Sequence, residues 1–154
     1  MNQDYKDLIA VFNEHGVEYI VVGAHALAAH GHVRATKDLD IWIRPSSDNA
    51  QRVMAALQSF GAALYDLTDK DLSSPGTVFQ MGVPPVRIDV ITAIDGVEFE
   101  EAWVSRVETT FAGRSASVLS REHLIKNKKA SGRTQDLADV EWLESHRSLP
   151  TKRK

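Results

Sequence analysis

The chain has 154 residues, of which 43% are hydrophobic and 25% are charged, and its formal net charge at neutral pH is −3. This composition excludes the fibrous and disordered classes, and the length suits one hydrophobic core, so we expect a single domain over residues 1–154. The absence of cysteine excludes disulfides and thiolate metal sites, and the acidic balance argues against specific binding of duplex DNA.

Local patterns in the first part of the chain predict alternating helices and strands. The N-terminus has no basic and apolar regions of a secretory signal. Apolar residues at helical spacing predict a helix over 3–16, followed by a buried β-branched strand over 17–22 and a second helix over 24–31. A strand over 37–45, stopped by proline, and a helix over 46–61 with a serine cap follow.

The second part of the chain is predicted to contain hairpins and further helices. Residues 64–75 show no firm period, and we expect a loop there with a short helical turn. The elements predicted after it are an antiparallel strand pair over 76–82 and 85–92, a helix over 98–106, a hairpin over 107–120, and two helices over 121–131 and 133–146 that Gly132 separates.

Helix and strand therefore mix along the whole chain. We expect the α/β (α+β) class, with a mixed β-sheet flanked by helices, early β-α-β crossovers and later hairpins. Residues 149–154 are expected to form a disordered basic tail. No apolar run approaches the roughly 20 residues of a membrane span, so we expect a cytoplasmic protein that does not bind membranes.

Three aspartates stand on two of the predicted strands. Because side chains alternate along a strand, Asp38 and Asp40 point to one face, and Asp89 shares a face with Arg87. If the two strands are neighbours, the three carboxylates meet in an oxygen-rich site suited to Mg²⁺, where the metal rather than a protein cation keeps them ionised. The alternative is that Asp38 and Asp40 are surface acids at the start of a strand.

A glycine turn precedes these acids. Gly23 follows a strand and opens a helix, which places backbone N–H groups at a helix N-terminus where an anion such as phosphate binds well. A plain turn residue is the alternative. The nearby His25, His30 and His32 lack a standard zinc spacing and a soft fourth ligand, so we expect them to pack or cap.

Basic residues stand on both sides of the acids in the sequence. Arg34 either binds phosphate or neutralises one of the aspartates, and Thr36 caps or buttresses the loop. The basic cluster over 121–133 is either a solvated helix face or a site for an anionic partner. Within it, Arg133 is expected to pair with Asp136 on the following helix.

Together, Gly23, the D-x-D pair Asp38 and Asp40, and Asp89 on a later strand resemble the nucleotidyltransferase superfamily, which has the polymerase-beta-like fold. The stretches "VVGAHALAAHGHVRATKDLDIWI" and "REHLIKNKKASGRTQDLADVEWL" are most similar to its bacterial branch that contains the abortive-infection toxins. The resemblance implies a transferase that moves NMP from an NTP, such as ATP or GTP, to an acceptor, with Mg²⁺ or Mn²⁺ as cofactor.

The resemblance also implies roles for individual residues. Asp38 and Asp40 would hold the metal, and Asp89 would bind a second metal or deprotonate the acceptor. The residues implied to bind the nucleotide are Gly23, Ala24, Arg34, Thr36, Lys126 and Lys129. Position 24 departs from the family pattern, which has glycine or serine there, so we expect weaker phosphate binding at this turn.

The acceptor and the biological role stay open at this point. RNA or a tRNA end, a protein and a small molecule of the aminoglycoside type are the candidate acceptors. The chain is also a candidate toxin of a toxin–antitoxin pair with a cognate antitoxin protein as partner. The alternative from another functional class is a catalytically weak protein that keeps the fold to bind such a partner.

Overall fold

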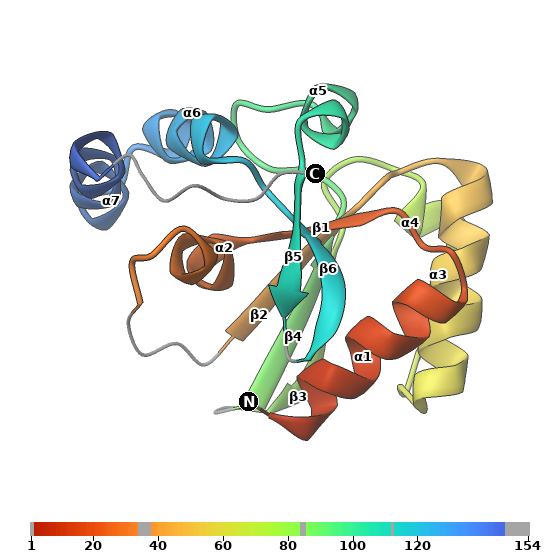
Figure 1. Cartoon of the computed structure of the whole chain (residues 1–154). Coiled ribbons are helices and arrows are strands. Elements are labelled where there is room, and N and C mark those ends of the chain that lie inside the picture. The colour runs from red at the N-terminus through yellow and green to blue at the C-terminus, as the bar shows by residue number, and fades with distance from the viewer. Residues whose placement is uncertain (1, 34–37, 84–85, 112, 147–154) are drawn as a thin grey trace.

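The computed structural model describes residues 2–33, 38–83, 86–111 and 113–146. These residues build a six-stranded mixed sheet flanked by helices, with strand order β3-β4-β2-β1-β6-β5 (Figure 1). The helices are α1 (Gln3–Glu14), α2 (Gly23–Ala29), α3 (Ser47–Phe60), α4 (Asp69–Leu72), α5 (Phe99–Val104), α6 (Arg121–Ser131) and α7 (Thr134–Ser145). The strands are β1 (Tyr19–Val22), β2 (Asp38–Ile43), β3 (Val78–Val83), β4 (Val86–Ile91), β5 (Val107–Phe111) and β6 (Arg114–Val118).

The predicted α/β class and the predicted order of elements are confirmed, including the short α4 and the break between α6 and α7. Ser46 caps α3, because its Oγ accepts a hydrogen bond of 3.2 Å from the backbone N–H of Asn49. Gly132 ends α6 in the left-handed conformation, with φ 66°. None of the described helices is long and apolar enough to cross a membrane.

The direction of β2 differs from the prediction. β2 runs antiparallel to β1 and parallel to β4, so the expected β-α-β crossover from β1 to β2 is wrong. The chain turns from β1 directly into α2 at Gly23, whose φ is 71°, and β2 then returns along β1 with Asp40 beside Val22. A hydrophobic period indicates the type of an element but not the direction in which the next strand returns.

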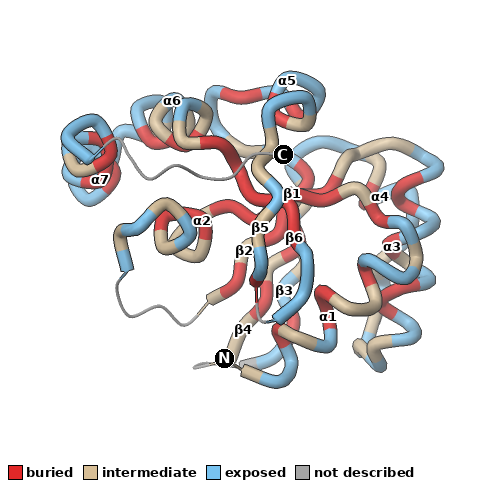
Figure 2. Tube along the Cα trace, viewed as in Figure 1, coloured by how far each residue is buried: buried red, intermediate tan, exposed pale blue. Residues whose placement is uncertain are grey.

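The two faces of β2 have different environments. Leu39 and Ile41 are fully buried in the core, and α1 and α3 lie side by side over one face of the sheet (Figure 1). On the other face, Trp42 packs edge-on against Phe99 of α5, with ring centroids 5.0 Å apart. The two acids of β2 share this second face where the strand begins, and they are half-buried (Figure 2).

Candidate active site

Acidic side chains of β2 and β4 meet on one face of the sheet. The two strands are parallel neighbours, in a register that places Asp40 beside Asp89 and Asp38 beside Arg87. The condition for the metal-site hypothesis, that these two strands be adjacent, is therefore confirmed. Register neighbours on adjacent strands point to the same face, so Asp38, Asp40 and Asp89 form one group, which we call the acid cluster.

A guanidinium group lies among these carboxylates. Arg87 Nη2 donates a hydrogen bond of 2.8 Å to Asp38 Oδ2, and Arg87 Nε lies 3.5 Å from Asp89 Oδ1. Arg87 stands two residues before Asp89 and points to the same face, so a protein cation contributes to compensating the acids beside any metal. A single guanidinium still leaves the cluster short of positive charge.

Burial and mutual repulsion both act on the acid cluster. Burial, followed by the charges of Asp89 and Asp38, raises the pKa of Asp40 to about 6. Burial also raises the pKa of Asp89, while the charge of Arg87 acts in the opposite direction. Carboxylates in such a setting favour a proton or a cation between them. Ionising the whole cluster at neutral pH without a metal therefore carries a free-energy penalty.

The donor set suits a hard divalent cation. Carboxylate oxygens are the ligands that Mg²⁺ and Mn²⁺ prefer, and Asp89 Oδ1 is buried without a hydrogen-bond partner. As the side chains stand, no group of three His, Asp or Glu residues in the described part of the chain is placed to hold a metal ion.

Gly23 lies directly against the acid cluster. A Cβ atom at this position would lie 2.4 Å from Asp40 Oδ2, and the backbone has φ 71°, so both the available space and the conformation require glycine. Ala24 follows in the first turn of α2, which therefore begins beside the acids as the sequence predicts. Arg34 and Thr36, the other predicted residues near this turn, lie outside the described residues.

Replacing Gly23 by alanine is expected to lower the free energy of unfolding by about 2–4 kcal/mol, through collision with Asp40 and backbone strain. Gly16→Ala is the matched control, because Gly16 has a similar φ of 67° but a Cβ there meets nothing within 4 Å. This control should lose only about 1 kcal/mol. Urea denaturation measures both variants, and equal losses would contradict the contact between Gly23 and Asp40.

Tyr5 of α1 lies near the site, where its hydroxyl donates a hydrogen bond of 3.4 Å to the backbone carbonyl of Arg87. Burial first, and then the charges of Asp38 and Asp40, raises the pKa of its phenol. Its ring packs edge-on against His25, which packs in the same way against Phe111, with centroids 5.4 Å apart in each pair. Burial lowers the pKa of His25, so this imidazole is neutral at physiological pH. In the sequence Tyr5 is one apolar position of a helix among several, and no pattern marks it as a site residue.

The other two histidines near the glycine turn also have contacts of the predicted kind. A ring nitrogen of His30, Nε2, hydrogen-bonds the backbone carbonyl of Leu119 at 2.8 Å. His32 stacks on Trp142 of α7, with ring centroids 4.4 Å apart. These contacts hold α2 and the segment after it against the last part of the chain.

The predicted phosphate-binding lysines pair with other acids. Lys126 Nζ lies 3.1 Å from Glu101 Oε2 on α5, and Lys129 Nζ lies 3.2 Å from Glu144 Oε2 on α7. In Figure 1, α2 lies between α6, which carries both lysines, and the beginning of β2. The ion pairs of Lys126 and Lys129 are with these glutamates, and the role of both lysines in nucleotide binding stays a prediction.

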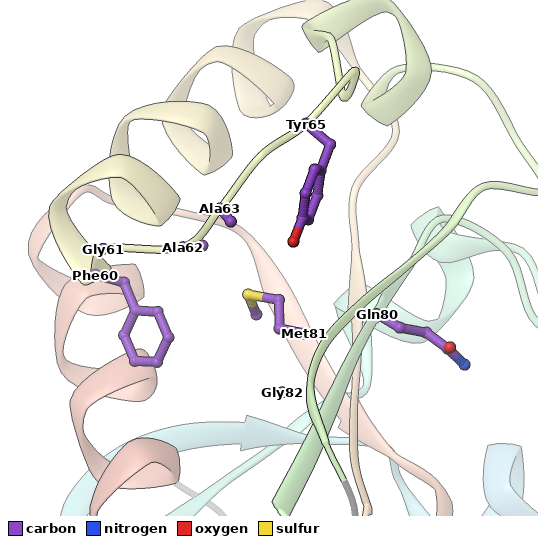
Figure 3. A pocket seen from close by; sticks show the side chains of 8 residues that line it. All are labelled: Phe60, Gly61, Ala62, Ala63, Tyr65, Gln80, Met81 and Gly82. Carbon is purple, nitrogen blue, oxygen red and sulfur yellow. The ribbon is translucent and has the colours of Figure 1, made fainter.

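A cavity of about 330 Å³ lies between the end of α3 and the edge strand β3 (Figure 3). It is lined by Phe60, Gly61, Ala62, Ala63, Tyr65, Gln80, Met81 and Gly82. The side chain of Met81 points into this space, whereas that of Gln80 points away (Figure 3). Gln80 is the register neighbour of Asp89 and shares its face, so the cavity lies on the other face from the acid cluster.

A family model described as "Nucleotidyl transferase of unknown function (DUF2204)" matches residues 1–152. The chain belongs to this family. The resemblance to the nucleotidyltransferase superfamily is thereby confirmed, and with it the assignment of the chain as a transferase. The likeness to the abortive-infection branch stays a prediction. Among curated proteins, none matches this chain.

Solved nucleotidyltransferases share the fold of this family member. The lincosamide antibiotic adenylyltransferase LnuA, with lincomycin bound, matches 94% of this chain and 97% of its own at 14% identity and a TM-score of 0.60. The antibiotic-resistance factor ANT(2'')-Ia matches 92% and 82% at 18% identity and a TM-score of 0.62. A putative nucleotidyltransferase from Thermotoga maritima matches 92% and 91% at 14% identity and a TM-score of 0.58. Identities this low show a shared fold and not a shared substrate.

Proposed function

We propose that this nucleotidyl transferase moves NMP from an NTP to a hydroxyl-bearing acceptor in a reaction that depends on Mg²⁺ or Mn²⁺. The acid cluster carries this proposal, because its oxygens lie on two adjacent strands beside the turn at Gly23. The raised pKa values of Asp40 and Asp89 fit carboxylates that await a cation. A surface pair of acids at the start of a strand would not be expected to show such shifts.

In this proposal each residue of the site has a defined task. Asp38 and Asp40 hold the metal, and Asp89 binds a second ion or accepts the proton of the acceptor hydroxyl. The backbone N–H groups of Gly23 and Ala24 donate to the phosphates. The acceptor oxygen forms the new bond to the α-phosphorus while the bond to pyrophosphate breaks. A bound divalent metal supplies neutralisation of the charge on the triphosphate.

We favour a small hydroxyl-bearing molecule as the acceptor. Among the described residues, Lys126 and Lys129 are both paired with glutamates, so an RNA acceptor that used these two lysines would have to displace those pairs. This chain covers 97% of LnuA, whose structure contains lincomycin. LnuA therefore has almost no chain outside the shared fold. ANT(2'')-Ia has been solved with adenylyl-2''-tobramycin. RNA, a tRNA end or a protein as acceptor, an antitoxin partner and a cytoplasmic location stay predictions.

The acceptor can be tested with the full chain, Mg²⁺ and each of the four NTPs labelled at the α-phosphate. Total RNA, soluble protein and a panel of lincosamide- and aminoglycoside-type compounds are offered separately. Label on a small molecule supports the favoured acceptor, and label on RNA alone replaces it. If no NTP binds in calorimetry with Mg²⁺ present, the transferase proposal fails and the partner-binding alternative takes its place.

A further inference from the structure

Arg87 places a positive charge among the carboxylates of the acid cluster. Its guanidinium hydrogen-bonds Asp38 and forms an ion pair with Asp89, and its side chain is 32% exposed. Arg87 Nε is buried and has no hydrogen-bond partner, and the same holds for Asp89 Oδ1 at 3.5 Å from it. The guanidinium therefore forms one short hydrogen bond, to Asp38, and its contact with Asp89 is a longer ion pair without a hydrogen bond.

The guanidinium and a divalent metal are attracted to the same carboxylates. If the acid cluster binds Mg²⁺, the ion would lie among the acids that Arg87 now partly neutralises, through Asp38 Oδ2 and beside Asp89 Oδ1, and the two positive charges would repel each other. A doubly charged ion among three carboxylates outcompetes a singly charged, delocalised one. Arg87 then lies beside the bound ion, with a planar fork of donors suited to phosphate oxygens.

We propose that Arg87 is the built-in counter-ion of the acid cluster, which releases Asp38 when the metal binds and then donates to the triphosphate of the NTP. This inference rests on the proposed function. It makes Arg87 a positioning residue for the metal and a binding residue for the nucleotide. The roles have opposite consequences: removing the guanidinium favours the metal, since nothing must be displaced, and disfavours the nucleotide.

Arg87→Gln tests both consequences without any need for turnover. Mn²⁺ titration of the full chain without nucleotide, followed by electron paramagnetic resonance, should show roughly tenfold tighter binding than in the wild type, because one competing charge is lost. Calorimetry with Mg²⁺ and a non-hydrolysable NTP should show roughly tenfold weaker nucleotide binding. Arg52→Gln, which removes the same charge from the exposed surface of α3, is the matched control and should change neither affinity.

A measurement on the wild-type protein covers the case in which Arg87→Gln does not fold. In protein with ¹⁵N-labelled arginine, the Nε–H signal of Arg87 should shift as Mg²⁺ saturates the site, while that of Arg52 stays in place. Equal Mn²⁺ affinity in wild type and Arg87→Gln, or an Arg87 signal that does not shift when Mg²⁺ binds, overturns this inference and leaves the proposed function in place. A wild-type chain that binds neither ion overturns the proposed function as well.

Discussion

Replacing Asp40 by asparagine is expected to stabilise the protein without metal and to abolish nucleotidyl transfer. Burial and the charges of Asp89 and Asp38 raise the pKa of Asp40 to about 6, so the ionised side chain destabilises the fold at pH 7.5. Asparagine has a similar size and no charge. We expect a gain of about 1–3 kcal/mol in the free energy of unfolding, measured by urea denaturation in EDTA. The loss of a metal ligand should slow transfer by roughly a thousandfold or more.

The pH dependence of this gain has a defined sign. The pKa of Asp40 is raised from the usual aspartate value of 3.8 to about 6 in the folded state. Between these two pH values the folded state holds a proton on Asp40 that the unfolded state has lost. Wild-type stability from this group therefore falls as pH rises through that window. The difference between Asp40→Asn and the wild type should be near zero below the window and largest above it.

A control variant and a measurement with Mg²⁺ test this expectation further. Asp66→Asn, an exposed aspartate between α3 and α4, removes the same charge and should change neither stability nor transfer appreciably. Saturating Mg²⁺ should raise the unfolding temperature of the wild type and leave that of Asp40→Asn unchanged. A variant that is less stable than the wild type at pH 7.5 in EDTA would contradict the description of Asp40 as a strained carboxylate.

Replacing Lys128 by methionine is expected to destabilise the fold by about 3–5 kcal/mol. Lys128 is 7% exposed, and its Nζ lies 3.4 Å from Asp136 Oδ1 and 3.1 Å from Asp139 Oδ2, both on α7. Each of these acids is 2% exposed. Burial opposes ionisation of Asp136, but hydrogen bonds from Arg133 and Ser131 and the charge of Lys128 lower its pKa to about 2. Without Lys128, buried negative charges would lose their central cation.

Lys129→Met is the control for Lys128→Met, because it removes a lysine from the same helix at an exposed position. Lys129 is the next residue of α6, is 57% exposed and pairs with Glu144, so its loss should change the free energy of unfolding by less than about 1 kcal/mol. Adding Asp139→Asn to Lys128→Met should recover part of the lost stability, because it removes one of the uncompensated charges. Thermal and urea unfolding measure all three proteins. Similar small losses in both single variants would exclude a stabilising network between α6 and α7.

The order of elements and the shared faces of the aspartates could be predicted from the sequence, because both follow from local periods. The period of two places Asp38 with Asp40 and Asp89 with Arg87, and adjacency of β2 and β4 was the condition left to the structure. Arg87 as the partner of Asp38 could not be predicted, since that contact depends on the register between strands distant in sequence. The antiparallel return of β2 along β1 depends on tertiary packing in the same way.

Helical spacing within the basic cluster over 121–133 does not show which of its lysines is buried. Helical spacing drew attention to Lys126 and Lys129, both of which are exposed and paired with glutamates. The buried member is Lys128, whose partners are on the next helix. The predicted pair of Arg133 with Asp136 is present, with Nε 2.8 Å from Oδ2. Nothing in a single helical period distinguishes a lysine that will be buried from its neighbours.

The most direct test of the proposed activity is the fate of two labels in one NTP. The full chain is incubated with Mg²⁺, the acceptor panel and an NTP radiolabelled at either the α- or the γ-phosphate. Nucleotidyl transfer predicts that the α-label becomes attached to an acceptor, that the γ-label leaves with pyrophosphate, and that EDTA or Asp40→Asn stops both. A γ-label on the acceptor, or α-label transfer that persists in EDTA and in Asp40→Asn, would contradict a metal-dependent nucleotidyl transferase built on the acid cluster.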